Sequence, residues 1–344
     1  MINLPFSVSD LTELRILPLL IASFLDWLIG DPWGFPHPVQ GMGWAIAFGK
    51  NIILKNIKTP LGQKLAGIGL NLVLLVGVAA IGGIIVQACY RLDRWLGIGV
   101  ESILLASCFA GRSLRDAAIA VIEPLEAGEI AQARSVLSLY VGRDTDNLEL
   151  PDILRAVLET VSENCTDGVI APLFYAAIGG VPLALAYKAA STLDSMIGYK
   201  REPYTHIGWF SAKLEDVLSW LPCRLTVILV AILSMLMMRQ NPLNIWRICQ
   251  RDAPHDPSPN SGWSECVFAA ALGVQLGGNN LYKGVMNVKP LLGDPIQPIT
   301  VAVIHQALQL MRWSFLFLLC LVVVRAVVSE WSVFSFQFSA FGFQ

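Results

Sequence analysis

A run of 26 residues without a charged side chain, Leu65–Tyr90, constrains this chain more than any other feature. Lys64 precedes the run and Arg91 follows it. As an α-helix it would be about 39 Å long, enough to cross a ~30 Å hydrocarbon core with some tilt. Only 15% of the whole chain is charged, against about 25% in soluble domains. These features exclude a disordered chain or an ordinary soluble enzyme and indicate a membrane protein.

Four further apolar stretches are candidate membrane spans, although charged residues lie within them or at their ends. They are 16–30 with Asp26, 95–111 with Glu101, 217–238 with Arg224, and 313–324 between Arg312 and Arg325. A spanning helix needs about 20 mostly apolar residues. We therefore predict an all-α fold, a polytopic helical membrane protein with about four or five spanning helices. Residues 1–344 are expected to form a single integral membrane domain.

Two apolar stretches do not match simple spans, because glycines interrupt them. Val169–Tyr187 is uncharged but contains Gly179-Gly180-Val181-Pro182 at its centre. A Pro-kinked spanning helix and a re-entrant hairpin of two half-helices both fit this pattern, since irregular backbone at membrane depth has to be covered by protein. Residues 266–282 are also uncharged, yet their glycines and asparagines would make a poor spanning helix. We expect both stretches to line a site.

The scarce charge is concentrated in an acidic block, residues 112–168, with 5 basic and 11 acidic side chains and a net charge of −6. Apolar residues recur in it at helical spacing, which predicts three helices. The loop Lys50–Lys64 carries four lysines and no acid, which favours the cytoplasmic side. The hairpin that follows would return the block to the cytoplasm, so we predict an acidic cytoplasmic helical insertion. The chain's net charge of −2 argues against a nucleic-acid partner.

An acidic stripe marks the third helix of this block. Arg155, Glu159, Glu163 and Asp167 recur every four residues and therefore share one helix face. One interpretation is a Mg²⁺ site, because Mg²⁺ takes oxygen ligands, usually one or two carboxylates together with substrate phosphates. The other interpretation is an ordinary solvated face, and the spacing alone does not separate the two.

Polar residues also mark the end of the first apolar segment. Asp26 lies inside that segment, Asp31 follows it, and a Pro-rich loop containing His37 comes next. A carboxylate inside an apolar segment is costly and indicates a functional site. A helix-end aspartate that faces water explains the same pattern.

Two later stretches combine polar side chains with a defined local structure. The first is Lys188, Thr192, Ser195 and Tyr199, which share one face of a predicted helix. A lysine with hydroxyls on one face suits phosphate binding, although a polar groove between helices would need the same residues. The second is Ser258-Pro259-Asn260-Ser261-Gly262-Trp263, whose proline, asparagine and glycine predict a rigid loop.

The order and spacing of these motifs over roughly residues 20–300 resemble the CobD/CbiB family of adenosylcobinamide-phosphate synthases. The segments that carry the resemblance are Asp26 with Gly30-Asp31-Pro32, Pro36-His37-Pro38-Val39, Gly142-Arg143-Asp144-Thr145, Glu163-Asn164, Asp167-Gly168-Val169-Ile170-Ala171-Pro172, Ala186-Tyr187-Lys188-Ala189, Thr192-Leu193-Asp194-Ser195-Met196-Ile197-Gly198-Tyr199, and the loop 258–263. Ser261 stands where alanine is common in the family, a minor departure.

The resemblance implies an enzyme of late cobalamin synthesis. Such an enzyme joins the free propionate of adenosylcobyric acid to the amine of (R)-1-aminopropan-2-ol or its O-phosphate, giving adenosylcobinamide or its phosphate. A carboxylate and an amine form a salt in water, so the carboxylate needs activation. ATP and Mg²⁺ are therefore expected, with an acyl phosphate as the activated form. The implied location is the inner (plasma) membrane, with the site facing the cytoplasm. A complex with other late cobalamin-pathway membrane enzymes is left open.

The matching positions carry the site residues that the resemblance implies. The catalytic candidates are Asp31, His37, Asp144, Lys188 and Asp194. The substrate-binding candidates are Arg143, Thr145, Asn164, Thr192, Ser195, Tyr199, Lys200, Ser258 and Asn260. The metal-ligand candidates are Glu163 and Asp167. Two other functions remain alternatives, a non-catalytic membrane sensor of the related AmpE-like type and a transporter.

Overall fold

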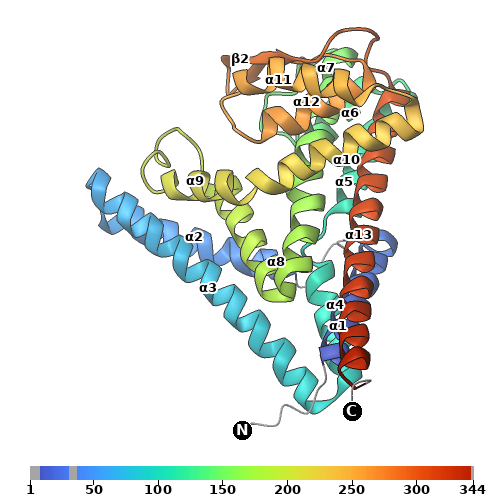
Figure 1. Cartoon of the computed structure of the whole chain (residues 1–344). Coiled ribbons are helices and arrows are strands. Elements are labelled where there is room, and N and C mark those ends of the chain that lie inside the picture. Colours follow the sequence, from blue (N-terminus) through green and yellow to red (C-terminus); the bar gives the residue numbers. More distant parts are fainter. Residues whose placement is uncertain (1–7, 31–36, 342–344) are drawn as a thin grey trace.

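The computed structural model describes residues 8–30 and 37–341, and helices dominate it (Figure 1). The α-helices are α1 (Val8–Leu28), α2 (Pro38–Asn56), α3 (Pro60–Leu92), α4 (Arg94–Ala106), α5 (Gly111–Glu126), α6 (Ile130–Leu137), α7 (Leu150–Asn164), α8 (Ala171–Ile197), α9 (Trp209–Leu218), α10 (Trp220–Met238), α11 (Pro242–Asp252), α12 (Ser261–Leu272) and α13 (Val301–Phe341). A π-helical turn, η1 (Cys165–Ile170), joins α7 to α8, and a 3₁₀ turn, η2 (Ala253–His255), follows α11. Strands β1 (Leu276–Tyr282) and β2 (Val285–Leu292) form an antiparallel hairpin.

Among the described residues, 5 helical segments are long and apolar enough to cross a membrane, which confirms the predicted polytopic helical fold. They are Pro60–Leu92, Arg94–Glu126, Leu150–Ile197, Trp220–Met238 and Val301–Val328. The segment predicted over 16–30 forms a shorter apolar helix, Ile16–Leu28. Two of the long segments include α5 and α7, so part of the acidic block continues directly from apolar helices.

The chain reverses direction in the middle of α8, at Gly179 and Gly180. Gly180 has φ 60° and ψ −150°, a backbone region that is essentially restricted to glycine. Gly168, which precedes α8, lies beside Ala110, just after α4. Gly180 lies beside Glu101, which is within α4 and earlier in the chain. The first half of α8 is therefore antiparallel to α4.

The second half of α8 packs along α3 in the opposite sense. Val181 and Leu185 lie beside Gly82 of α3, whereas Leu193 packs near Leu70, earlier in that helix. Since α3 and α4 are themselves an antiparallel pair, the two halves of α8 run in opposite directions. Of the two arrangements that the sequence left open, the structure has the hairpin of half-helices (Figure 1).

Replacing Gly180 tests this reversal. We expect Gly180→Ala to lower the free energy of unfolding by about 1–3 kcal/mol, because alanine is strained at this backbone conformation. Gly77→Ala is the matched control, because a Cβ there meets nothing within 4 Å. In a helix interior that change is expected to stabilise by about 0.5–1 kcal/mol. Thermal unfolding in detergent measures both, and equal stability of Gly180→Ala and wild type would contradict the strained turn.

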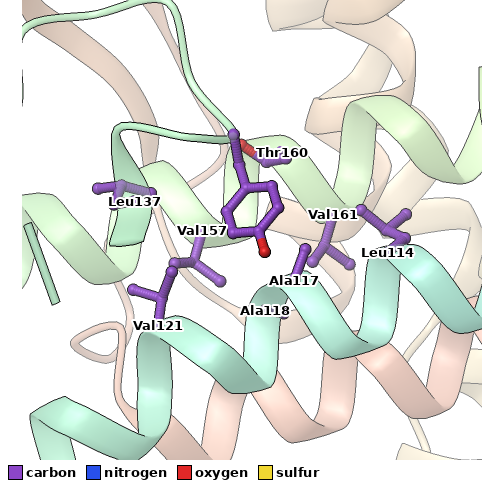
Figure 2. A pocket seen from close by; sticks show the side chains of 9 residues that line it. Leu114, Ala117, Ala118, Val121, Leu137, Val157, Thr160 and Val161 are labelled. Carbon is purple, nitrogen blue, oxygen red and sulfur yellow. The ribbon is translucent and has the colours of Figure 1, made fainter. Parts of the chain in front are cut away.

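The three helices predicted for the acidic block are present as α5, α6 and α7, and they pack against one another. Figure 2 shows Leu114 and Val121 of α5, Leu137 of α6, and Val157 and Val161 of α7 around their shared interface. The hollow that remains there is only about 10 Å³. It is therefore well-filled core and has no room for a substrate.

The β-hairpin was not expected from the sequence. Residues 266–282 supply the end of α12 and all of β1, and β2 follows after a turn at Lys283 and Gly284. Both turn residues have positive φ, 52° and 76°, as a two-residue hairpin turn of the mirror-image type requires. The pairing register shifts between Leu276 and Gly278, where Gly277 has φ 86°. This irregular strand lacks the alternation by which strands are recognised.

Candidate functional site

A buried network of charges joins α7 to the hairpin. Glu159 is only 2% exposed, and its carboxylate accepts hydrogen bonds from Arg143 and from Arg155, the latter at 3.2 Å. The backbone N–H of Gly277 donates to the same carboxylate at 3.0 Å. Arg143 also donates to the side-chain oxygen of Asn280 at 2.8 Å. The solvated-face interpretation is therefore wrong for Glu159, which two arginines hold inside the protein.

Asp144 holds the turn of the hairpin. Its carboxylate accepts from the backbone N–H of Lys283 at 2.9 Å and of Gly284 at 2.7 Å. Its own N–H donates to the carbonyl of Leu281 at 2.8 Å. This geometry gives a structural task to a residue predicted as catalytic. A direct part for Asp144 in the reaction stays a prediction.

A second ion pair reaches from β2 to α12. Lys289 donates to Glu265 at 2.8 Å, and the Glu265 side chain is fully enclosed at 0% exposure. Burial raises the pKa of Glu265 to about 8; the cation of Lys289 opposes the rise, and the carboxylates of Glu163 and Glu159 add to it. Lys289 also acts electrostatically on Glu163. A cation thus faces one of the predicted metal ligands, and no motif in the sequence pointed to it.

Five carboxylates gather where α7, η1, α8 and α9 meet. We call them the carboxylate cluster: Glu163, Asp167, Asp194, Glu215 and Asp216. Asp167 lies within electrostatic range of Glu163, Asp194 and Glu215, and Asp194 lies within range of Asp216. All five side chains are half-buried. The structure therefore brings three predicted site residues together and adds two that the sequence did not single out.

A hydrogen-bonded chain crosses the cluster from Asp167 to Glu215. The Tyr187 hydroxyl lies 3.4 Å from Asp167 Oδ1 and 2.9 Å from Ser219 Oγ. Ser219 in turn donates to the carboxylate of Glu215. Burial raises the pKa of Glu215 to about 7; the Ser219 hydroxyl opposes the rise, and the charges of Asp194 and Asp216 add to it. A carboxyl group that titrates near neutrality can act as a general base at physiological pH.

The cluster has the donor chemistry that Mg²⁺ prefers, namely half-buried carboxylate oxygens that repel one another without a cation. Asp167 lies on the π-turn η1 and not on the regular helix α7. The predicted four-residue stripe thus continues from α7 onto the π-turn, where Asp167 lies within electrostatic range of Glu163. Within the described ranges, no three His, Cys, Asp or Glu side chains converge as a ready-made metal cage. The predicted Mg²⁺ site does not require such a cage, because it has only two protein ligands, Glu163 and Asp167, and substrate phosphates would supply the others.

The predicted phosphate-binding face of α8 is present only in part. Lys188 is half-buried, while Thr192 donates its hydroxyl to the Lys188 carbonyl at 2.6 Å and Ser195 donates to the Thr192 carbonyl at 3.0 Å. Tyr199 does not share this face, because α8 ends at Ile197. Gly198 is the C-cap of α8, a stop signal that the predicted face did not take into account.

Four further polar candidates lie in different parts of the described chain. Lys200 is exposed. His37 caps α2, where its Nδ1 accepts from the Val39 N–H at 3.2 Å. Thr145 is buried at 4% exposure, and Asn164 is exposed and donates to the Thr160 carbonyl at 2.9 Å. Asp31 lies outside the described residues.

The loop 258–263 forms the start of α12 and fixes it against α9 and α10. Asn260 is 5% exposed and donates to the Asp216 carbonyl at 2.8 Å. Arg224 donates to the Asn260 side-chain oxygen at 2.9 Å. The Ser258 hydroxyl accepts from the N–H of Ser261 at 3.2 Å. The predicted loop is present at 258–260, whereas 261–263 form the first turn of α12.

Comparisons with known proteins support the resemblance. The family model described as CobD/Cbib protein matches residues 19–311. A relative from Synechocystis sp., named cobalamin biosynthesis protein CobD, is 51% identical over 89% of this chain and 91% of its own length. A relative from Salmonella typhimurium, named cobalamin biosynthesis protein CbiB, is 43% identical over 92% of this chain and 99% of its own length. No solved structure matches. The chain belongs to the CobD/CbiB family.

Proposed function

We propose that this protein forms an amide bond in cobalamin biosynthesis. Its reaction would join the free propionate of adenosylcobyric acid to the amine of (R)-1-aminopropan-2-ol or its O-phosphate. Two observations support the proposal. The family model covers residues 19–311 and the relatives are named cobalamin biosynthesis proteins. The carboxylate cluster also places a carboxyl group with a pKa of about 7, Glu215, among acids suited to a magnesium complex.

ATP is the co-substrate in this proposal, because a carboxylate does not condense with an amine unaided. Phosphoryl transfer from ATP to the propionate would break the bond between the γ-phosphorus and the oxygen that joins it to the β-phosphorus, and would release ADP. The amine nitrogen would then attack the acyl carbon, form the C–N bond and release inorganic phosphate. Lys188 and Lys200 are the proposed partners of the phosphate oxygens. Arg143 is left out of this role, since its guanidinium is occupied by Glu159 and Asn280.

Glu163 and Asp167 would hold Mg²⁺, whose bound charge would screen the phosphate oxygens. The chain's own contribution is the handling of protons. Glu215 would accept the proton that the amine loses when its nitrogen becomes an amide. Ser219 donates a hydrogen bond to Glu215 and so orients this carboxylate. Tyr187 links the same serine to Asp167. This link would hold the proposed base at a fixed distance from the proposed metal ligand.

The pH dependence of the rate tests the part proposed for Glu215. Below a pH of about 7 its carboxyl group is protonated and cannot accept a proton; above that value it is ionised and can. We expect kcat to rise through about pH 7 in the wild type. Glu215→Gln should lose this inflection and about 10²–10⁴-fold in rate. Exposed Glu202→Gln serves as control. A Glu215→Gln variant that keeps both rate and inflection would contradict the assignment.

The setting of the reaction is also a proposal. The membrane would be the inner (plasma) membrane, crossed several times, with the carboxylate cluster on the cytoplasmic side where ATP is present. The acidic block would lie on the same side. A complex with other late cobalamin-pathway membrane enzymes fits a pathway that hands on large amphipathic intermediates, and co-purification from membranes would test it.

A further inference from the structure

A second hollow lies between α1, α5 and α13, and none of the five carboxylates of the cluster lines it. These helices contact one another, and α13 is the C-terminal helix drawn in red in Figure 1. The cavity between them has a volume of about 840 Å³, within the ~300–1,000 Å³ of small-molecule sites. α13 is a candidate membrane span, α1 is a shorter apolar helix, and α5, part of the acidic block, continues from the apolar α4.

One end of the cavity is apolar. On α13, Leu316 and Leu319 line it, and on α1 Leu20 and Phe24 do so. Phe24 is 55% exposed and Leu20 is 40% exposed. Large apolar side chains that point into a hollow and remain accessible mark a place where another molecule packs. In a bilayer, the acyl chain of a lipid is the apolar group available to pack there.

The other end of the cavity is basic. Arg112 and Arg115 of α5 line it, and Arg312 of α13 lies over the ring of Trp27 with its guanidinium carbon 5.9 Å from the centroid. Asp116 pairs with both Arg112 and Arg115. Arg312 forms no ion pair within the described part of the chain.

The polar and apolar lining residues of the cavity are separated along the lengths of α1 and α13. Along α13 the lining residues His305 and Arg312 come before Leu316 and Leu319, whereas along α1 the apolar Leu20 comes before the polar end. Trp27 meets Arg312, so the polar ends of the two helices coincide. Asp26 is the one carboxylate among the lining residues that the structure describes. The cavity is therefore amphipathic along its length, with a surplus of cations at one end.

We propose that this cavity binds an anionic phospholipid. The phosphate would lie between Arg312 and Arg115, since guanidinium groups bind phosphate oxygens with paired N–H donors. One acyl chain would fill the apolar end along Leu20 and Leu316. Phosphatidylglycerol is the probe of this chemistry. None of the five side chains of the carboxylate cluster lines this cavity, and its test measures lipid retention and not turnover.

Lipid retention by purified variants tests the site. The protein is purified in mild detergent, its lipids are extracted and quantified by mass spectrometry, and its Tm is measured with phosphatidylglycerol or phosphatidylcholine added. We expect phosphatidylglycerol to be retained preferentially and to raise the Tm. The double variant Arg115→Gln/Arg312→Gln should retain about 25-fold less, since each basic side chain near anionic lipid contributes about fivefold, or ~1 kcal/mol. Arg247→Gln, an exposed arginine on α11, should behave as wild type.

Further arms separate a lipid from other ligands. Leu316→Trp keeps the charges but fills the apolar end, and we expect it to reduce retention even if the arginine variants fail to fold. Glycerol 1-phosphate, which carries the head without the tail, should leave the Tm unchanged. Equal retention of phosphatidylglycerol by all variants would overturn the proposal, as would an equal Tm shift with glycerol 1-phosphate. The same holds if the double variant loses binding of a corrinoid and keeps its lipid.

Discussion

Asp167→Asn should abolish turnover and leave the fold intact. Asp167 lies at the centre of the carboxylate cluster, within electrostatic range of Glu163, Asp194 and Glu215. Asparagine keeps the shape of the side chain but removes the negative charge that would hold Mg²⁺. A metal ion that screens phosphate oxygens contributes several kcal/mol of transition-state stabilisation. We therefore expect kcat to fall on the order of 10³-fold.

The control for this variant is Asp146→Asn. Asp146 is exposed in the loop before α7 and belongs to the same acidic block. The amide product is quantified by mass spectrometry at saturating substrate, and size-exclusion profiles and Tm confirm the fold. Higher Mg²⁺ concentrations should partly restore a variant that has lost one of two ligands. Near-normal turnover of Asp167→Asn would refute its part in metal binding.

The second large effect concerns stability. Arg143→Ala should strongly destabilise the protein, because it leaves the 2% exposed Glu159 with one arginine fewer. Breaking a buried ion pair by removing one partner costs about 3–5 kcal/mol. Asn280 of β1 would lose a donor at the same time, so the hairpin should detach first.

The matched comparison is Asp152→Asn, which breaks an exposed ion pair on α7, the helix that also carries Glu159. Asp152 pairs with Arg155 at 2.9 Å, but its side chain is 45% exposed. An exposed pair of this kind contributes about 0–1 kcal/mol. Thermal unfolding followed in detergent, with limited proteolysis of the hairpin, measures both variants. Similar Tm values for Arg143→Ala and Asp152→Asn would show that the buried pair does not anchor the hairpin.

The helical elements of this protein could be predicted from sequence, since apolar runs and helical spacing are local signals. Leu65–Tyr90 falls within α3, and the three helices of the acidic block appear as α5, α6 and α7. The motifs also led to the correct family, and both metal-ligand candidates, Glu163 and Asp167, lie together in the carboxylate cluster.

What could not be predicted depends on contacts between distant segments. Glu215 comes from α9 and Lys289 from β2, and neither residue follows a motif. The buried ion pair of Arg143 with Glu159 was not predicted either, and a substrate contact of Arg143 stays a prediction. The reversal at Gly180 was one of two arrangements that the sequence allowed, because Gly-Gly-Val-Pro breaks a helix without specifying its new direction. The hairpin was missed because its first strand shows no alternation.

Conversion of adenosylcobyric acid by the purified protein tests the proposed function most directly. The protein is reconstituted in lipid, supplied with (R)-1-aminopropan-2-ol or its O-phosphate and with Mg²⁺-ATP, and the corrinoids are analysed by mass spectrometry. We expect adenosylcobinamide or its phosphate to form, one ADP to appear for each amide, and no product to appear without ATP. Absence of product with substrates of proven quality would contradict this function. Passage of the corrinoid across the bilayer without chemical change would indicate a transporter instead.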